Sequence, residues 1–244
     1  MNIPSASRVD PPTEPRATRS IRNVLIWDAP VRVFHWLMVL SFAGAWLTAE
    51  SERWRLAHVT LGYTMAGLVA FRIVWGLIGT RHARFLSFVK GPAAVARYLR
   101  SLVVGRPEHH AGHNPAGALA ILALLAMTLA VAATGWALYN EVGGHWLEEL
   151  HEGAASLMLA IVGVHVAAVV LASWLHRSNL IAAMLTGRRL GSPAEGVRSA
   201  WRSVAFALLL SVMGFWWTQW QATPSTAAAD VSATVPRHAH RHHD

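Results

Sequence analysis

Hydrophobic residues fall into five long runs along the chain, and short polar segments separate them. A helix needs about 20 mostly apolar residues to cross the hydrocarbon core of a bilayer. Each run is close to or above that length. The pattern therefore predicts an all-α membrane protein with five candidate spans. They cover residues 33–49, 57–79, 116–139, 146–175 and 201–220.

Residues 85–105 have a different pattern. Their apolar positions recur at helical spacing and alternate with basic ones. This arrangement predicts one amphipathic helix that lies at the membrane surface rather than a span. The apolar positions are Phe88, Val95, Tyr98, Leu99 and Leu102, and the basic ones are Lys90, Arg97 and Arg100.

Composition supports the membrane interpretation. Only 14% of the 244 residues are charged and 54% are hydrophobic, whereas about 25% of a typical soluble domain is charged. The net charge of +8 comes mainly from arginines between the apolar runs. We therefore expect membrane lipid, and no nucleic acid, as a partner of this basic chain.

The distribution of charge predicts the topology. The N-terminal tail and the segments after the second and fourth runs are basic, while the connection after the third run carries only acidic charges, Glu141, Glu148 and Glu149. The positive-inside rule then places the N-terminus in the cytoplasm. The expected regions are a disordered cytoplasmic tail (1–24), a four-helix domain (25–190), a linker with an additional span (191–222) and a His-rich periplasmic tail (223–244).

Four of the fourteen histidines lie within the spans, at positions 35, 58, 151 and 165. An ionisable side chain inside a membrane suggests a function. His165 follows His151 by fourteen residues, roughly 21 Å along the same helix face. His35 matches the depth of His165, and His58 matches that of His151. The spacing predicts two imidazole pairs at opposite membrane depths.

Two facing imidazoles suit the axial positions of a haem iron. Zinc and copper usually take three or four protein ligands, and the absence of cysteine excludes covalent c-type haem and iron–sulfur clusters. Histidines that only bridge helices by hydrogen bonds are the structural alternative. The functional alternative is a helical metal-ion transporter that uses the buried histidines, although the spans contain almost no carboxylates.

Three further residues are candidates for cofactor binding. Arg72 lies in the second run, where it could pair with a haem propionate or extend to the membrane surface, and Arg32 could act similarly. His113 precedes Asn114 and Pro115 at the start of the third run. A role in beginning the helix is favoured there, and a propionate contact, a quinone contact or a proton relay is the alternative.

Taken together, these residues resemble the bacterial cytochrome b561 and nickel-hydrogenase cytochrome b family, over about residues 24–189. Order and spacing carry the resemblance more than any single motif. The matching elements are Trp27-Asp28, Arg32, His35-Trp36, His58, Gly62, Arg72, Trp75-Gly76, Gly112-His113-Asn114-Pro115, Gly117, Thr134-Gly135, His151 and His165.

The resemblance implies a four-helix transmembrane bundle that holds two b-type haems. His35 and His165 would bind the cytoplasmic-side haem, and His58 and His151 the periplasmic-side haem. It also implies electron transfer across the bacterial inner membrane, as an electron-transfer protein or a quinone oxidoreductase subunit. The expected partners are a quinone and a periplasmic c-type cytochrome or hydrogenase-like enzyme, and a homodimer is a further alternative. The fifth run and the His-rich tail lie outside the family pattern.

Overall fold

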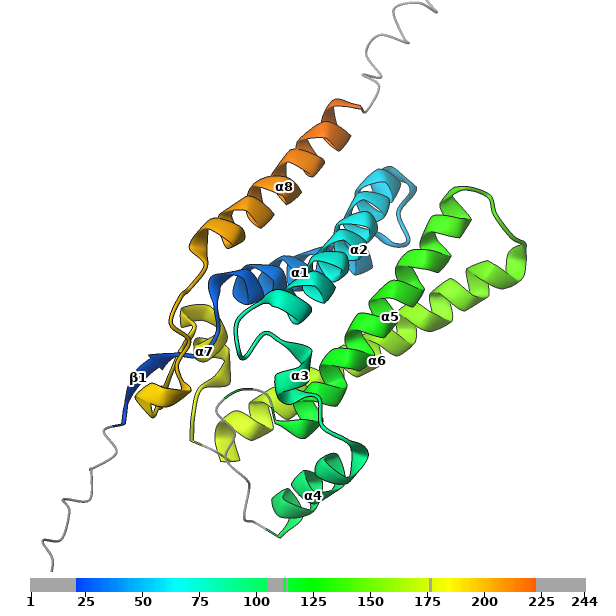
Figure 1. Cartoon of the computed structure of the whole chain (residues 1–244). Helices are drawn as coiled ribbons and strands as arrows, with labels where there is room; N and C mark the ends of the chain where they lie inside the picture. The colour runs from blue at the N-terminus through cyan, green and yellow to red at the C-terminus, as the bar shows by residue number, and fades with distance from the viewer. Residues whose placement is uncertain (1–20, 105–111, 113, 176, 223–244) are drawn as a thin grey trace, which may run out of the picture.

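The computed structural model describes residues 21–104, 112, 114–175 and 177–222. Most of the predicted N-terminal tail, the His-rich tail and His113 lie outside these described residues. Five long helices dominate the structure (Figure 1), and each is long and apolar enough to cross a membrane. They are α1 (Ala29–Thr48), α2 (Arg55–Ile78), α5 (Pro115–Tyr139), α6 (His145–Leu175) and α8 (Arg202–Gln221).

The long helices agree with the predicted runs to within a few residues, with the largest difference at the start of α1. This helix begins at Ala29 rather than Val33. The side chain of Asp28 caps it by accepting the backbone N–H of Val31, and Pro30 lies in its first turn. A proline is favourable there because the first-turn amide has no helical acceptor.

The helices form two hairpins. α1 packs along α2, α5 packs along α6, and α2 and α5 join the two hairpins. The additional helix α8 packs mainly against α1 and runs along the outside of the first hairpin (Figure 1). α6 therefore contacts the rest of the bundle chiefly through α5.

The prediction of one continuous amphipathic helix over residues 85–105 is wrong. The segment forms two helices, α3 (Phe85–Phe88) and α4 (Pro92–Val103), with extended backbone at Val89 between them. Pro92 explains the break, because a proline lacks the N–H for a helical hydrogen bond and disfavours helical backbone at the residue before it. α4 lies against α5.

A small sheet that was not predicted joins the two ends of the four-helix region. β1 (Arg22–Leu25) pairs antiparallel with β2 (Arg188–Gly191), which follows the short helix α7 (Leu180–Thr186). The carbonyl of Gly187 also accepts the N–H groups of Ile26 and Trp27. Gly187 has a φ of 78°, a left-handed conformation that favours glycine. The strand includes residues 22–24, which the sequence assigned to the tail.

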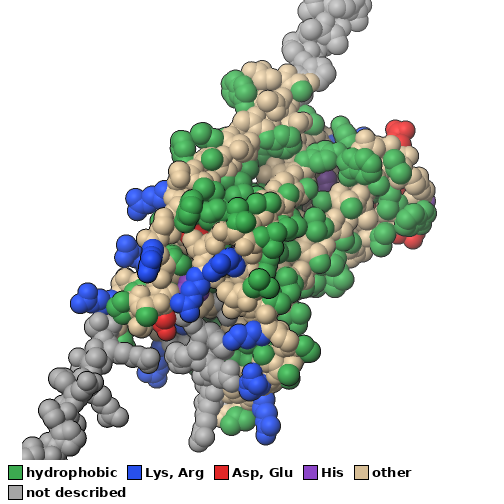
Figure 2. Space-filling view, viewed as in Figure 1, with side chains coloured by type: hydrophobic (Ala, Val, Ile, Leu, Met, Phe, Trp, Pro, Cys, Tyr) green, Lys and Arg blue, Asp and Glu red, His purple; other side chains and the backbone are tan. Residues whose placement is uncertain are grey.

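Charged side chains are separated along the molecule (Figure 2). Most Lys and Arg side chains gather at the end that holds the sheet, α7 and α4. Acidic side chains gather at the opposite end, at the α5–α6 turn, and hydrophobic side chains cover the surface between. This is the distribution expected of a bundle whose basic end faces the cytoplasm.

A buried carboxylate connects the start of α1 to the end of α2. Asp28 is only 1% exposed. Besides the N–H of Val31 at 2.9 Å, it accepts the indole N–H of Trp75 at 3.1 Å and the hydroxyl of Thr80 at 2.6 Å. Three donors satisfy a group that would otherwise be costly to bury.

The additional helix α8 is an integral part of the core. Its Val212 packs in a buried cluster with Phe34 and Leu37 of α1 and Leu68 of α2. In addition, the indole N–H of Trp216 donates to the hydroxyl of the buried Thr64 in α2, at 2.9 Å.

Replacing Asp28 should destabilise the protein more than replacing any one of its donors. We expect Asp28→Ala to cost about 3 kcal/mol of unfolding free energy, because it leaves several buried donors unpaired. Thr80→Val should cost only about 1 kcal/mol, because it removes one bond and its donor together. Unfolding of the purified variants in mixed detergent and SDS measures both. Equal losses for the two variants would show that Asp28 does not connect the helices.

Candidate functional site

The structure brings His58 and His151 together at one end of the bundle. His58 lies in the first turn of α2, and His151 lies in the second turn of α6. Their ring centroids are 6.4 Å apart and their planes are inclined by 77°. Both side chains are half-buried. Two helices with little backbone contact thus present one imidazole each toward the other.

Hydrogen bonds orient both rings of this pair. Nδ1 of His58 lies 2.8 Å from the carbonyl oxygen of Ala45, which can only accept, so Nδ1 carries the proton. Nδ1 of His151 lies 2.9 Å from the hydroxyl of Thr134. That hydroxyl donates to the carbonyl of Ala130 at 2.9 Å, and therefore accepts from His151. In each ring the lone pair is left on Nε2, the nitrogen available to bind a metal.

A glycine allows α5 to approach this pair closely. A Cβ at Gly135 would lie 3.0 Å from Cε1 of His151, tighter than ordinary van der Waals contact. Gly135 follows Thr134 directly, so the residue that accepts the hydrogen bond and the residue that leaves room for the ring are neighbours in the sequence.

The second predicted pair, His35 and His165, shares only α6 with the first, and His165 lies further along that helix than His151. His35 is on α1 and His165 is on α6, and the charge of His165 acts on His35. Both are half-buried. Nδ1 of His35 is buried and has no hydrogen-bond partner among the described residues, and the same holds for the indole nitrogen of the adjacent Trp36.

The two predicted arginines lie at the basic end of the bundle. Arg72 is 2% exposed, and its guanidinium lies over the ring of Phe85, 4.8 Å from the centroid. Its Nη1 has no partner within the described ranges. Gly76, one turn further along α2, makes room for Phe85, because a Cβ there would overlap the phenyl ring. Arg32 instead donates to the carbonyl of Leu185.

These features fit haem better than a smaller metal site. An ion bound between two imidazoles needs ring centroids about 6 Å apart, given about 2 Å per metal–nitrogen bond and about 1 Å from nitrogen to ring centre. The outer pair meets this value. Over the residues that the structure describes, no cluster of three or more His, Cys, Asp or Glu could hold a metal ion. The geometry therefore gives the metal-transporter alternative no support.

The contact of Thr134 with His151 was not predicted, because Thr134 entered the sequence analysis only as part of the Thr134-Gly135 motif. The hairpin contains a signal that could have found it. Thr134 and His151 are equally far from the α5–α6 turn, which centres near Val142 and Gly143, so antiparallel packing places them at the same depth. The acceptor role of Ala45 was also missed, because a backbone carbonyl leaves no trace in residue type.

Comparison with known proteins agrees with these features. Residues 26–187 match the family model described as prokaryotic cytochrome b561. This stretch contains both histidine pairs, α1, α2, α5 and α6, and ends at the Gly187 turn. No solved structure matches the chain significantly.

Several curated proteins are similar to about half of the chain or more, and each is named as a probable Ni/Fe-hydrogenase B-type cytochrome subunit. The protein of Rhizobium leguminosarum bv. viciae is 24% identical, over 71% of this chain and 92% of its own length. That of Azotobacter vinelandii is 28% identical, over 68% and 88%. The hydrogenase 1 subunit of Escherichia coli K12 is 29% identical, over 48% and 60%.

Proposed function

The chain belongs to the prokaryotic cytochrome b561 family, and on this premise we propose that it carries electrons through two b-type haems. His58 and His151 hold one haem, and His35 and His165 hold the other. Membership of the family already makes the chain a multi-pass bacterial membrane protein that binds haem b and transfers electrons. The number of haems and their ligands are the proposal.

The geometry of His58 and His151 is the observation that supports it most. The ring centroids lie 6.4 Å apart with the planes inclined by 77°, and both Nδ1 atoms have acceptors. A histidine that only bridged helices would use both nitrogens for hydrogen bonds within the protein. Here the hydrogen bonds to Ala45 and Thr134 use only Nδ1 of each ring, which leaves Nε2 of each for an axial position.

The residues around the two pairs would orient the imidazoles and balance the charge of the haem propionates. Haem b, when bound, supplies a one-electron redox centre. Ala45 and Thr134 hold the outer imidazoles in one tautomer and orientation. At the basic end, the unpartnered Nη1 of Arg72 is a suitable donor for a propionate, and Arg32 is a second candidate. His113 lies outside the described residues, so its role stays a prediction from sequence.

The electron path that we propose runs between a membrane quinone and a partner on the periplasmic side. The N-terminus is cytoplasmic in this proposal, because the basic end holds β1 and β2. The relatives are named as hydrogenase cytochrome subunits, which supports a hydrogenase-like partner. The exposed Glu141, Glu148 and Glu149 at the opposite end equally suit a basic c-type cytochrome.

Removing one ligand of the outer pair should remove one haem and leave the other. We expect His151→Ala to lower the haem-to-protein ratio from two to one, because the inner pair keeps both its imidazoles. His145→Ala, an exposed histidine on the same helix, is the matched control and should keep both haems. Haem extraction and a redox titration measure the result. Loss of neither haem would refute the pairing.

Removing the acceptor for His151 should raise the potential of one haem only. An acceptor on Nδ1–H makes the imidazole a stronger donor and favours oxidised iron. Thr134→Val should therefore raise the midpoint potential of the outer haem by roughly tens of millivolts, the scale of one hydrogen bond. Thr128→Val is the control, because this buried hydroxyl of α5 bonds only to its own helix, at Leu124. Equal shifts in both variants would contradict the assignment.

Neutralising the acidic end should change the salt dependence of electron transfer. If Glu141, Glu148 and Glu149 guide a basic c-type cytochrome to this surface, replacing all three by Gln removes the attraction that salt screens. We expect the rate of cytochrome c reduction to fall at low salt and to lose its dependence on ionic strength. Stopped-flow kinetics measure it, and chemical reduction of the protein's own haem should be unchanged. Unaltered salt dependence would exclude this docking surface.

A further inference from the structure

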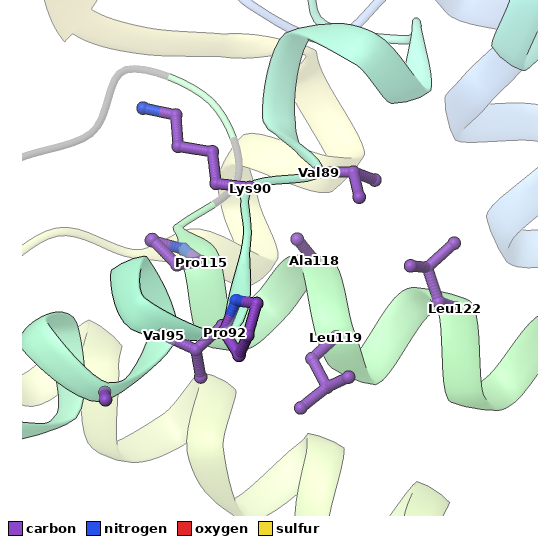
Figure 3. A pocket seen from close by; sticks show the side chains of 9 residues that line it. Val89, Lys90, Pro92, Val95, Pro115, Ala118, Leu119 and Leu122 are labelled. Carbon is purple, nitrogen blue, oxygen red and sulfur yellow. The ribbon is translucent and has the colours of Figure 1, made fainter.

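A pocket of about 370 Å³ lies where the α3–α4 connection meets the beginning of α5, within the size range of small-ligand sites. Aliphatic side chains and prolines line it (Figure 3). Among them are Val89, Val95, Pro115, Ala118, Leu119 and Leu122. Lys90 is the one charged residue among the described residues of the lining. Its side chain leaves the rim, and its ammonium points away from the apolar walls (Figure 3).

We propose that this pocket binds an anionic phospholipid, with part of an acyl chain in the pocket and the headgroup phosphate at Lys90. The proposal goes beyond electron transfer and does not depend on the haem ligands. An apolar interior with one cation at its rim matches the two ends of such a lipid in shape and in charge. No described residue forms a hydrogen bond or ion pair with the Lys90 ammonium.

The place of the pocket in the fold suits a lipid headgroup. It lies between the first and eighth residues of α5, which span about 10 Å, at the end of the bundle where basic side chains gather (Figure 2). α4, which forms one wall, also carries the exposed Arg97 and Arg100. Basic pockets between helices on the cytoplasmic side attract anionic headgroups, at about 1 kcal/mol per cation near the surface.

A quinone headgroup is the competing occupant, and the lining does not favour it. Reduction of a quinone needs hydrogen-bond donors at its two carbonyls and a route for protons. Among the described residues that line it there is no His, Asp, Glu, Ser, Thr or Tyr. Lys90 alone could donate, from the rim. The chemistry of the walls thus matches a saturated chain better than a polar ring.

Native mass spectrometry of the full, haem-loaded chain tests the proposal. Detergent-purified protein is incubated separately with phosphatidylglycerol, phosphatidylcholine and a short-chain ubiquinone. Lys90→Gln removes the headgroup contact. Ala118→Phe fills the pocket from a position that is 3% exposed, and Leu119→Gln, which is 57% exposed, makes the wall polar with less risk to folding. Arg198→Gln is the matched control, because it removes an exposed cation after β2, outside the pocket lining.

We expect one tightly held phosphatidylglycerol per chain in the wild type and in Arg198→Gln. Lys90→Gln should bind it about fivefold more weakly and lose the preference over phosphatidylcholine. Both pocket variants should lose the lipid while their haem-to-protein ratio stays at the wild-type value. Displacement of the lipid by the quinone, equal binding of the two phospholipids by the wild type, or full binding by Leu119→Gln would overturn the proposal.

Discussion

The position of α1 against α2 depends on the buried carboxylate of Asp28. It caps α1 through Val31 and accepts hydrogen bonds from Trp75 and Thr80 at the end of α2. Since an unsatisfied donor is costly in a low-dielectric interior, these contacts hold the start of one helix level with the end of the next. The depth of each histidine follows from this constraint. His35 lies seven residues after Asp28, the cap of α1, and His58 lies at the opposite end of α2 from Trp75.

The two histidine pairs obtain their orientation in different ways. In the outer pair, polar atoms of neighbouring helices hold both rings, through the carbonyl of Ala45 and the hydroxyl of Thr134. In the inner pair, Nδ1 of His35 has no such acceptor among the described residues. A fixed hydrogen bond determines the tautomer and donor strength of an imidazole, whereas packing determines only its direction. Under the proposed ligation, the two pairs would therefore give a haem iron different electronic surroundings, even though each supplies two histidines.

Much of this architecture was predictable from sequence, because long apolar runs and the depth of buried histidines follow from helix geometry alone. The facing of His58 and His151 was anticipated by counting residues from the membrane surface. What was missed depends on contacts between distant segments. The β1–β2 pairing joins residues 22–25 to residues 188–191, and neither segment has a strong strand pattern by itself. The break between α3 and α4, by contrast, could have been predicted, because Pro92 is visible in the sequence and its effect on a helix is local.

The part of the chain that matches the family is not the whole of the packed unit. The match ends at residue 187, whereas α8 begins at Arg202 and packs on α1 and α2. The carbonyl of Ala200 accepts the N–H of Ala29, so the linker before α8 helps to complete the beginning of α1. Val212 then packs against Phe34, the residue immediately before His35. A four-helix bundle would leave this face of α1 to lipid. Here a fifth helix of the same chain covers it, and the surroundings of the inner histidine pair thus include a segment that the family pattern does not contain.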